Sequence, residues 1–169
     1  NIGNQNEPIQ QISIEPANPI AYHEAVQAIE EADAVVIGPG SLFTSIIPNL
    51  LIPGIIKALH NTKGTKIFIT NVATQLAETN SFSAFDHFQA LCRHIENDKL
   101  IDIVLVNNEF TNIPLPEEFQ AEPVLIDIDN FPNNVRIIQK KLVNEENRYH
   151  HDSILLAKAI IEIIYNNSK

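Results

Sequence analysis

The chain has 169 residues, of which 44% are hydrophobic and 19% charged, and its formal net charge is −10. This length suffices for one domain with a substantial core. The acidic balance argues against broad binding to nucleic acid or anionic membranes, although backbone amides could still form a local anion site. No apolar stretch reaches the roughly 18 residues of a membrane span, and the single Cys92 cannot form an internal disulfide. These features predict a cytoplasmic protein that binds neither nucleic acid nor membrane.

Predicted strands and helices alternate along the chain. Apolar patterns place strands at 9–15, 34–37, 66–70, 101–106, 124–128 and 135–143. Helices are expected at 18–31, 53–60, 83–97 and 152–165, with Asn18 and Asp152 as N-caps, and a proline-rich loop at 112–123. Strands that alternate with helices pair in parallel through right-handed crossovers. The sequence therefore predicts an α/β fold, with a Rossmann-like, mostly parallel sheet and flanking helices.

The apolar strand 34–37 stops at the turn Gly38-Pro39-Gly40-Ser41. Glycines allow backbone conformations and close approaches that a Cβ would block. A turn at the carboxyl end of a buried parallel strand is where open α/β sheets place ligands. Exposed N–H groups followed by Ser41, Thr44 and Ser45 suit a phosphate. The pattern is neither GxGxxG nor a P-loop, so a tight turn without a ligand is an equally good interpretation.

Two further strand ends carry polar clusters. Asn107 and Asn108 follow the strand at 101–106. The cluster after the strand at 66–70 comprises Asn71, Thr74, Gln75, Glu78 and Thr79. Turn chemistry explains each cluster singly, because Asn and Thr favour turns. The carboxyl ends of parallel strands share one edge, however, and three clusters at one edge favour a ligand crevice.

Two histidine motifs have structural as well as functional explanations. Asp86-His87 lies near a helix start, where the helix dipole favours Asp. The functional alternative places His87 at the rim of the crevice, where it would contact a phosphate or hold the loop that carries Glu78. His150-His151-Asp152 resembles a metal cluster, but Asp152 is better explained as an N-cap and adjacent histidines usually cannot both reach one ion. We therefore predict no metal site within this chain, and no catalytic constellation stands out.

The residues also carry a family likeness. The segment 32–51 reads ADAVVIGPGSLFTSIIPNLL and closely resembles the "AD..V.GPGSLYTS..PNLL" signature of the YvcK/CofD-like family, which comprises gluconeogenesis-factor-type proteins and 2-phospho-L-lactate transferases. The segment 71–79 resembles that family's NxxTQxGET, with Leu76-Ala77 in place of the usual Pro-Gly and Ala73 in place of a common Met. Asp86-His87 resembles its DH.

The resemblance covers only the family's C-terminal half. The family's GGGTG turn and Asp-Asp-Gly-Gly segment do not occur here, and the chain opens on Asn1 without any Met, which indicates a piece of a longer protein or an incomplete sequence. The resemblance implies that residues 1–169 form a single α/β unit, the C-terminal half of a larger CofD-like domain. One wall of a nucleotide site would then lie here and the other outside.

The resemblance implies one of two functions. One branch is a cytoplasmic regulator that binds UDP-sugars and is needed for growth on gluconeogenic carbon sources and for normal cell shape. The alternative branch is a 2-phospho-L-lactate transferase of deazaflavin coenzyme biosynthesis, which uses a guanylated donor and Mg²⁺. The segments 15–19 and 151–152 match the regulator branch, so a UDP-sugar-binding regulator is the leading hypothesis.

The predicted ligand is a nucleotide or nucleotide sugar. Its expected contacts are Gly38, Pro39, Gly40, Ser41, Thr44, Ser45, Asn49, Asn71, Thr74, Gln75, Glu78, Thr79 and His87. Any Mg²⁺ would be bound mainly by acids outside this chain. A third hypothesis is an assembly surface, in which the apolar run at 46–56 packs against another subunit, giving a homo-oligomer, or against the missing half.

Overall fold

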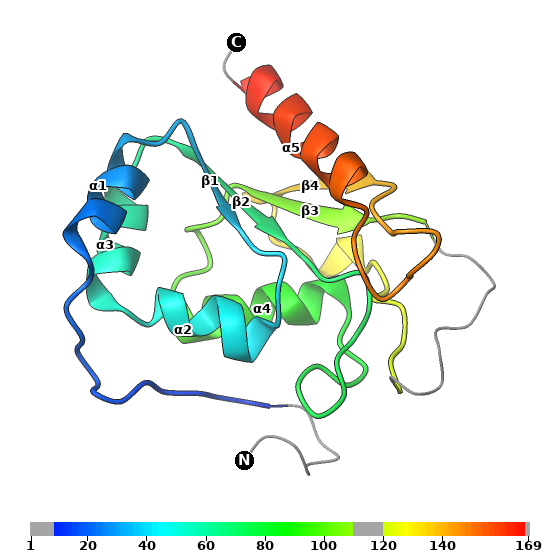
Figure 1. Ribbon diagram of the computed structural model, residues 1–169, viewed down its shortest axis with the longest axis horizontal. Helices are drawn as coiled ribbons and strands as arrows, with labels where there is room; N and C mark the ends of the chain where they lie inside the picture. Colours follow the sequence, from blue (N-terminus) through cyan, green and yellow to red (C-terminus); the bar gives the residue numbers. More distant parts are fainter. Residues whose placement is uncertain (1–8, 110–119, 168–169) are drawn as a thin grey trace.

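A single parallel sheet of four strands organises the computed structural model, which describes residues 9–109 and 120–167 (Figure 1). The strands lie in the sheet in chain order, and each neighbouring pair is parallel. They are β1 (Ala34–Ile37), β2 (Thr65–Ile69), β3 (Ile103–Asn107) and β4 (Arg136–Lys140). The predicted α/β fold with a parallel sheet is confirmed, and the carboxyl ends of the strands share one edge.

Helices cover both faces of this sheet. They are α1 (His23–Glu31), the π-helix η1 (Leu42–Ile46), α2 (Ile47–Leu50), α3 (Pro53–Asn61), α4 (Ala84–Ile95), the 3₁₀ helix η3 (Ile128–Asn130) and α5 (Ser153–Asn167). The helices η1, α2 and α4 pack against one face and α5 against the other (Figure 1). Because β3 lies centrally between these layers, all five of its residues are buried.

Local capping fixes where α4 and α5 begin. The Ser83 hydroxyl accepts from the Asp86 amide at 3.1 Å, and the Asp86 carboxylate accepts from the Ser83 amide at 2.8 Å, which forms a capping box. At α5, the Asp152 carboxylate accepts from the amides of Ile154 and Leu155, each at 2.9 Å. The structural explanations of Asp86 and Asp152 as residues of helix starts are therefore confirmed.

Two predicted strands are absent, and one predicted helix begins later than expected. Residues 9–15 do not form a strand, because the amides of Ile9 and Ile12 donate to a loop carbonyl and to a histidine ring instead of to a neighbouring strand. Residues 124–128 do not form one either, since Val124 makes its backbone bond to the loop residue Val72. The first helix begins at His23 and not at Asn18. Most of the predicted loop at 112–123 lies outside the described residues.

The apolar run at 46–56 serves this chain's own core. Ile46, Ile47 and Leu50 are buried in the cluster beneath β1 and β2, so these side chains are not available to a partner subunit. Cys92 is buried in the same cluster, and burial raises the pKa of its thiol to about 12, as expected for an inert core cysteine. Within the described ranges no single helix is long and apolar enough to cross a membrane, although the bent pair Leu42–Leu50 and Pro53–Asn61 meets the length and composition together.

Candidate ligand site at the carboxyl edge of the sheet

The turn after β1 requires a glycine at its first position. Gly38 has a φ of +86°, a conformation that L side chains rarely adopt. A Cβ there would also lie 3.0 Å from Cδ1 of Ile46 and 3.1 Å from the carbonyl oxygen of Ile69. At Gly40 the nearest atom to a Cβ would be Cβ of Ser45 at 3.5 Å, an ordinary contact. The close approach predicted for this turn is therefore confirmed at Gly38, whereas a Cβ at Gly40 would have room.

The turn delivers the chain directly into a helix start. The carbonyl of Ser41 accepts from the amides of Ser45 and Ile46, at 2.9 and 3.1 Å, and so closes the first turn of η1. The amides at the beginning of a helix have no acceptor within the helix itself and give that end a partial positive charge. The first amides of η1 therefore follow directly on Ser41, which is the N-cap of η1 and lines the candidate cavity described below.

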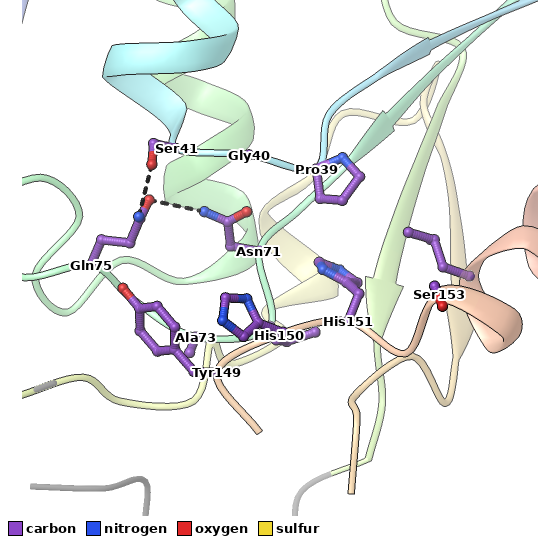
Figure 2. Close-up of a pocket in the computed structure, with 12 residues that line it drawn as sticks. Pro39, Gly40, Ser41, Asn71, Ala73, Gln75, Tyr149, His150, His151 and Ser153 are labelled. Carbon is purple, nitrogen blue, oxygen red and sulfur yellow. Dashed lines mark hydrogen bonds between the residues drawn. The ribbon is translucent and has the colours of Figure 1, made fainter. Parts of the chain in front are cut away.

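The loop after β2 is joined to this turn by side chains. The Gln75 side-chain amide donates to the Ser41 hydroxyl at 2.8 Å, and the Asn71 amide donates to the Gln75 carbonyl oxygen at 3.4 Å (Figure 2). The Gln75 backbone amide donates to the Thr79 hydroxyl at 2.9 Å, which fixes the loop behind it. Two of the predicted polar clusters thus meet through a hydrogen-bonded chain across the strand ends.

The loop after β2 has an alanine with a positive φ, a backbone conformation typical of glycine. Ala77 has a φ of +65° and occupies the position where the resembling family has Gly. Its amide donates to the Asn80 side chain at 2.7 Å, which holds the turn. Ala77 therefore holds a backbone conformation that an L residue adopts only at an energetic cost.

A third wall comes from the segment before α5, which the sequence-based prediction did not place at the site. The rings of Tyr149 and His150 pack edge to face, with centroids 5.4 Å apart, and lie across from the Asn71–Gln75 pair in Figure 2. Nε2 of His151 lies 3.1 Å from the carbonyl oxygen of Thr70. Burial lowers the pKa of His151 to about 4, so the ring is neutral at pH 7 and Nε2 donates this bond.

The three walls enclose a cavity of about 440 Å³, within the usual range for small-molecule sites. Its lining is Pro39, Gly40, Ser41, Asn71, Val72, Ala73, Gln75, Tyr149, His150, His151, Ser153 and Leu156. No carboxylate stands among these described lining residues, although the whole chain carries a net charge of −10. Such a lining does not repel an anionic ligand.

The other predicted contacts lie elsewhere. Gly38, Ser45 and Asn49 line a second cavity of about 320 Å³ beside β1, on the other side of the turn. The Thr44 hydroxyl donates to the Glu78 carboxylate at 3.1 Å, and that side chain is 9% exposed. The Thr74 hydroxyl accepts from the Glu122 amide at 2.9 Å. Thr74 and Thr79 are buried, at 3% and 0% exposed, so their hydroxyls support the loop from behind.

His87 is not at the rim of the crevice, and that part of the functional interpretation is wrong. Its side chain is 1% exposed, its Nδ1 lies 2.8 Å from the Ser83 carbonyl, and its ring packs edge to face on Phe82 at 5.6 Å. Burial lowers its pKa, so the ring is neutral. His87 lies on the buried face of α4, where its ring meets Phe82 at the end of the loop.

Asn107, at the end of β3, is explained by turn chemistry. Its carbonyl oxygen accepts from the amides of Leu142 and Val143, at 2.9 and 3.2 Å, and its side-chain amide donates to the Glu109 carbonyl at 2.9 Å. Every polar atom of this buried side chain is therefore used by the backbone around it. The third polar cluster shares the edge but adds nothing to the cavity lining.

The described residues do not by themselves fit a magnesium site. Magnesium prefers an octahedral set of oxygen ligands, usually including one or two carboxylates. In the ranges 9–109 and 120–167, no group of three or more His, Cys, Asp or Glu side chains is arranged to hold a metal ion. We therefore derive no chemical step through a metal.

The chain is similar to known proteins over most of its length. A family model described as "2-phospho-L-lactate transferase CofD" matches residues 1–143. The putative gluconeogenesis factor of Clostridium acetobutylicum is 43% identical over 162 residues, and the match covers 93% of this chain and 36% of that protein. The putative gluconeogenesis factor of Aquifex aeolicus is 35% identical, over 97% of this chain and 51% of that protein.

Solved structures show the same fold. A crystal structure of a Bacillus halodurans protein superposes with a TM-score of 0.85 at 34% identity, over 92% of this chain and 51% of that chain. A second Bacillus halodurans structure, described as a member of the UPF0052 family, superposes with a TM-score of 0.80 at 33% identity. The chain thus spans about half the length, or less, of these relatives.

Proposed function

This chain belongs to the CofD family, and on that premise we propose that it binds a nucleotide sugar, of the UDP-sugar class, as part of a cytoplasmic regulator of carbon metabolism and cell shape. The observation that carries the proposal is the cavity in which the Gly38–Ser41 turn, the Asn71–Gln75 loop and the Tyr149–His151 segment converge. The similarity to gluconeogenesis factors supports the regulatory role.

The phosphates would lie against the turn after β1. The start of η1 offers backbone donors there, Gly40 presents no side chain, and the lining has no carboxylate. Ser41 reaches the same place, with its hydroxyl held by Gln75 at 2.8 Å. Gln75 therefore orients the phosphate side of the site by fixing Ser41, in addition to any contact of its own.

The opposite wall suits the organic part of the ligand. The rings of Tyr149 and His150 offer flat surfaces to a base or sugar, and the Asn71 amide offers hydrogen bonds to hydroxyl or carbonyl groups. The neutral His151 keeps this wall in place through its bond to Thr70 and brings no charge of its own.

We also propose that this is one half of the site. Within the described residues β1 pairs only with β2, so its other edge is open, and Val36 is 38% exposed there. Doubly wound sheets bind ligands where the strand order reverses, next to such an edge strand. An element added beyond β1 would face Ser45 and Asn49 across the second cavity and complete a larger CofD-like domain.

A second candidate function is a transferase of the 2-phospho-L-lactate type, because the matching family model carries that description. In that case the turn would hold the donor phosphate, and acids outside this chain would bind Mg²⁺. Binding of a deazaflavin distinguishes the two candidates, since the acceptor has no place in the regulator.

Calorimetric titration of the full-length protein with UDP-N-acetylglucosamine, and in parallel with a deazaflavin, tests the proposal. We expect heat and a raised melting temperature with the nucleotide sugar alone. If the nucleotide sugar gives neither at a ligand concentration of about 1 mM, the proposal is wrong. Deazaflavin binding, followed by product in the presence of a guanylated lactate donor, would establish the transferase instead.

A further inference from the structure

The extended segment Ile9–Ile14, which we call the strap, runs along the lower edge of the molecule in Figure 1, below α2 and α4. Ile9 and Ile12 pack against the core. Two backbone amides hold it at distant points. The Ile9 amide donates to the Glu78 carbonyl at 3.0 Å, and the Ile12 amide donates to Nε2 of His94 at 3.0 Å. The strap therefore connects helix α4 to the loop that carries Gln75 and Glu78.

The bonds of His94 define its protonation state. Nδ1 lies 2.7 Å from the Ala90 carbonyl oxygen, which can only accept, so Nδ1 carries a proton. Nε2 accepts from the Ile12 amide and therefore carries none. An imidazolium has donors on both nitrogens, and a second proton on His94 would set two donors against each other. The bond to the strap thus exists only while His94 is neutral.

Few charges surround this histidine. A cavity of about 460 Å³ lies beside it, lined by strap residues, Leu51, Arg93, His94 and Glu96. Arg93 and Glu96 lie on α4 itself, one on either side of His94 in sequence. The strap and the segment 42–51, which includes the Phe43 ring that packs edge to face on His94 at 5.7 Å, contain no ionisable side chain. Protonation of His94 is therefore the charge change that bears directly on the strap.

Hydrogen bonds of Glu78 link the strap to the candidate site. The carbonyl of Glu78 accepts from the strap, and its carboxylate accepts from Thr44 of η1 at 3.1 Å. The same loop fixes Gln75, whose side chain holds Ser41. Release of the strap would remove a backbone support from the loop that positions the phosphate turn.

We infer that His94 is a positioning residue: in its neutral form it latches the strap and thereby orders the 75–79 loop, and a second proton releases both. The inference concerns the order of the loop, and it holds whether or not the cavity takes a nucleotide.

Amide hydrogen exchange, expressed as protection relative to the unstructured rate at each pH, tests the latch as the pH is lowered from about 8 for as long as the amides of β3 stay protected. We expect protection of the Ile12 amide to fall on the order of tenfold as the pH is lowered, the effect of leaving a backbone donor without its partner. Protection of the Gln75 amide should fall in the same titration. Amides of β3 report on the global fold.

Two variants test separately whether the strap needs a hydrogen-bond acceptor at position 94 and whether a second proton on His94 removes that acceptor. His94→Gln keeps an acceptor that does not titrate, so Ile12 should stay protected across the range. His94→Phe keeps a ring on Phe43 without an acceptor, so Ile12 should be unprotected throughout while β3 stays protected; if it does not fold, His94→Gln decides alone. His23→Gln, an exposed histidine on α1, is the control and should behave like the parent.

Three results would overturn the inference. Parental protection of Ile12 in a folded His94→Phe variant would show that Nε2 does not hold the strap. A parental loss of protection in His94→Gln at the acidic end would show that another group titrates. Release of Ile12 with no change at Gln75 would show that the strap does not order the loop.

Discussion

The end of β3 uses its polar residues differently from the ends of β1 and β2, which lie at the same edge of the sheet. After β3, the side chain of Asn107 bonds to the backbone of the loop that follows it and of the connection after β4. Both of its polar side-chain atoms therefore have partners. After β1 and β2, Ser41, Asn71 and Gln75 bond to one another across the edge and leave a cavity beside them. Polar residues at the end of a strand therefore indicate a site only where they line a cavity, as Ser41, Asn71 and Gln75 do and Asn107 does not.

The largest expected effect is at the turn after β1. Gly38→Ala should lower the free energy of unfolding by about 2–4 kcal/mol, because it combines a positive φ with close contacts to Ile46 and the Ile69 carbonyl. Gly40→Ala is the matched control and should change it by less than about 1 kcal/mol, since its Cβ has room. Urea denaturation of both variants measures the difference, and equal losses would contradict the proposed requirement at Gly38.

The wall formed by His151 should make stability depend on pH. Its folded pKa of about 4 lies below that of an unfolded histidine, about 6.5, so between these values the unfolded state binds more protons. Stability should therefore fall by about 2–3 kcal/mol as the pH drops through that window. Denaturation midpoints at several pH values measure this, and His151→Gln should remove that part of the slope. An unchanged slope in the variant would assign the dependence to other groups.

Gln75→Ala and Asn107→Ala sharpen the comparison directly. Asn107→Ala leaves two buried backbone amides without an acceptor and should lower the free energy of unfolding by about 2 kcal/mol. The affinity of the folded protein for a nucleotide sugar should not change. Gln75→Ala should cost about 1 kcal/mol or less but weaken binding about tenfold, because Ser41 loses its partner. Calorimetry and denaturation on each variant test this, and the reverse pattern would place the site at the end of β3.

The smallest expected effect is at Ala77. Ala77→Gly should stabilise the protein by about 1 kcal/mol, since the alanine pays for a φ of +65° that glycine adopts freely, offset in part by the greater freedom of glycine in the unfolded chain. Thermal unfolding measures it. Destabilisation would mean that contacts of the Ala77 methyl group outweigh the backbone strain.

Local pattern was enough to predict most of the fold. The apolar strand before Gly38 and the stripe of α4 both carry their own signals, and so does the cap Asp152. The strap has the alternation of a strand, but its amides are taken by His94 and by the Glu78 carbonyl, partners more than 60 residues away for which no local signal exists. Ala21, two residues before the first helix, also has a partner distant in sequence, since it lies against Gly54 of α3.

The site was predicted in part. The strand-end rule pointed to the turn and Gln75. The functional interpretation of Asp86-His87 placed His87 at the rim of the crevice, whereas this side chain is buried on α4. The Tyr149–His151 wall was missed because the rule was not applied to the connection after β4, which reaches the same edge through the bridge between Val143 and His151. Applied there, the rule would have found it.

We propose that the turn after β1, and not the end of β3, receives the ligand. Backbone amide NMR shifts of the full-length protein, followed during titration with UDP-N-acetylglucosamine, test it most directly. We predict that the amides of Gly40, Ser41 and Gln75 shift together and saturate while those of Asn107 and Asn108 stay in place. Saturable shifts at Asn107 and Asn108, with Gly40 and Ser41 unmoved, would contradict it.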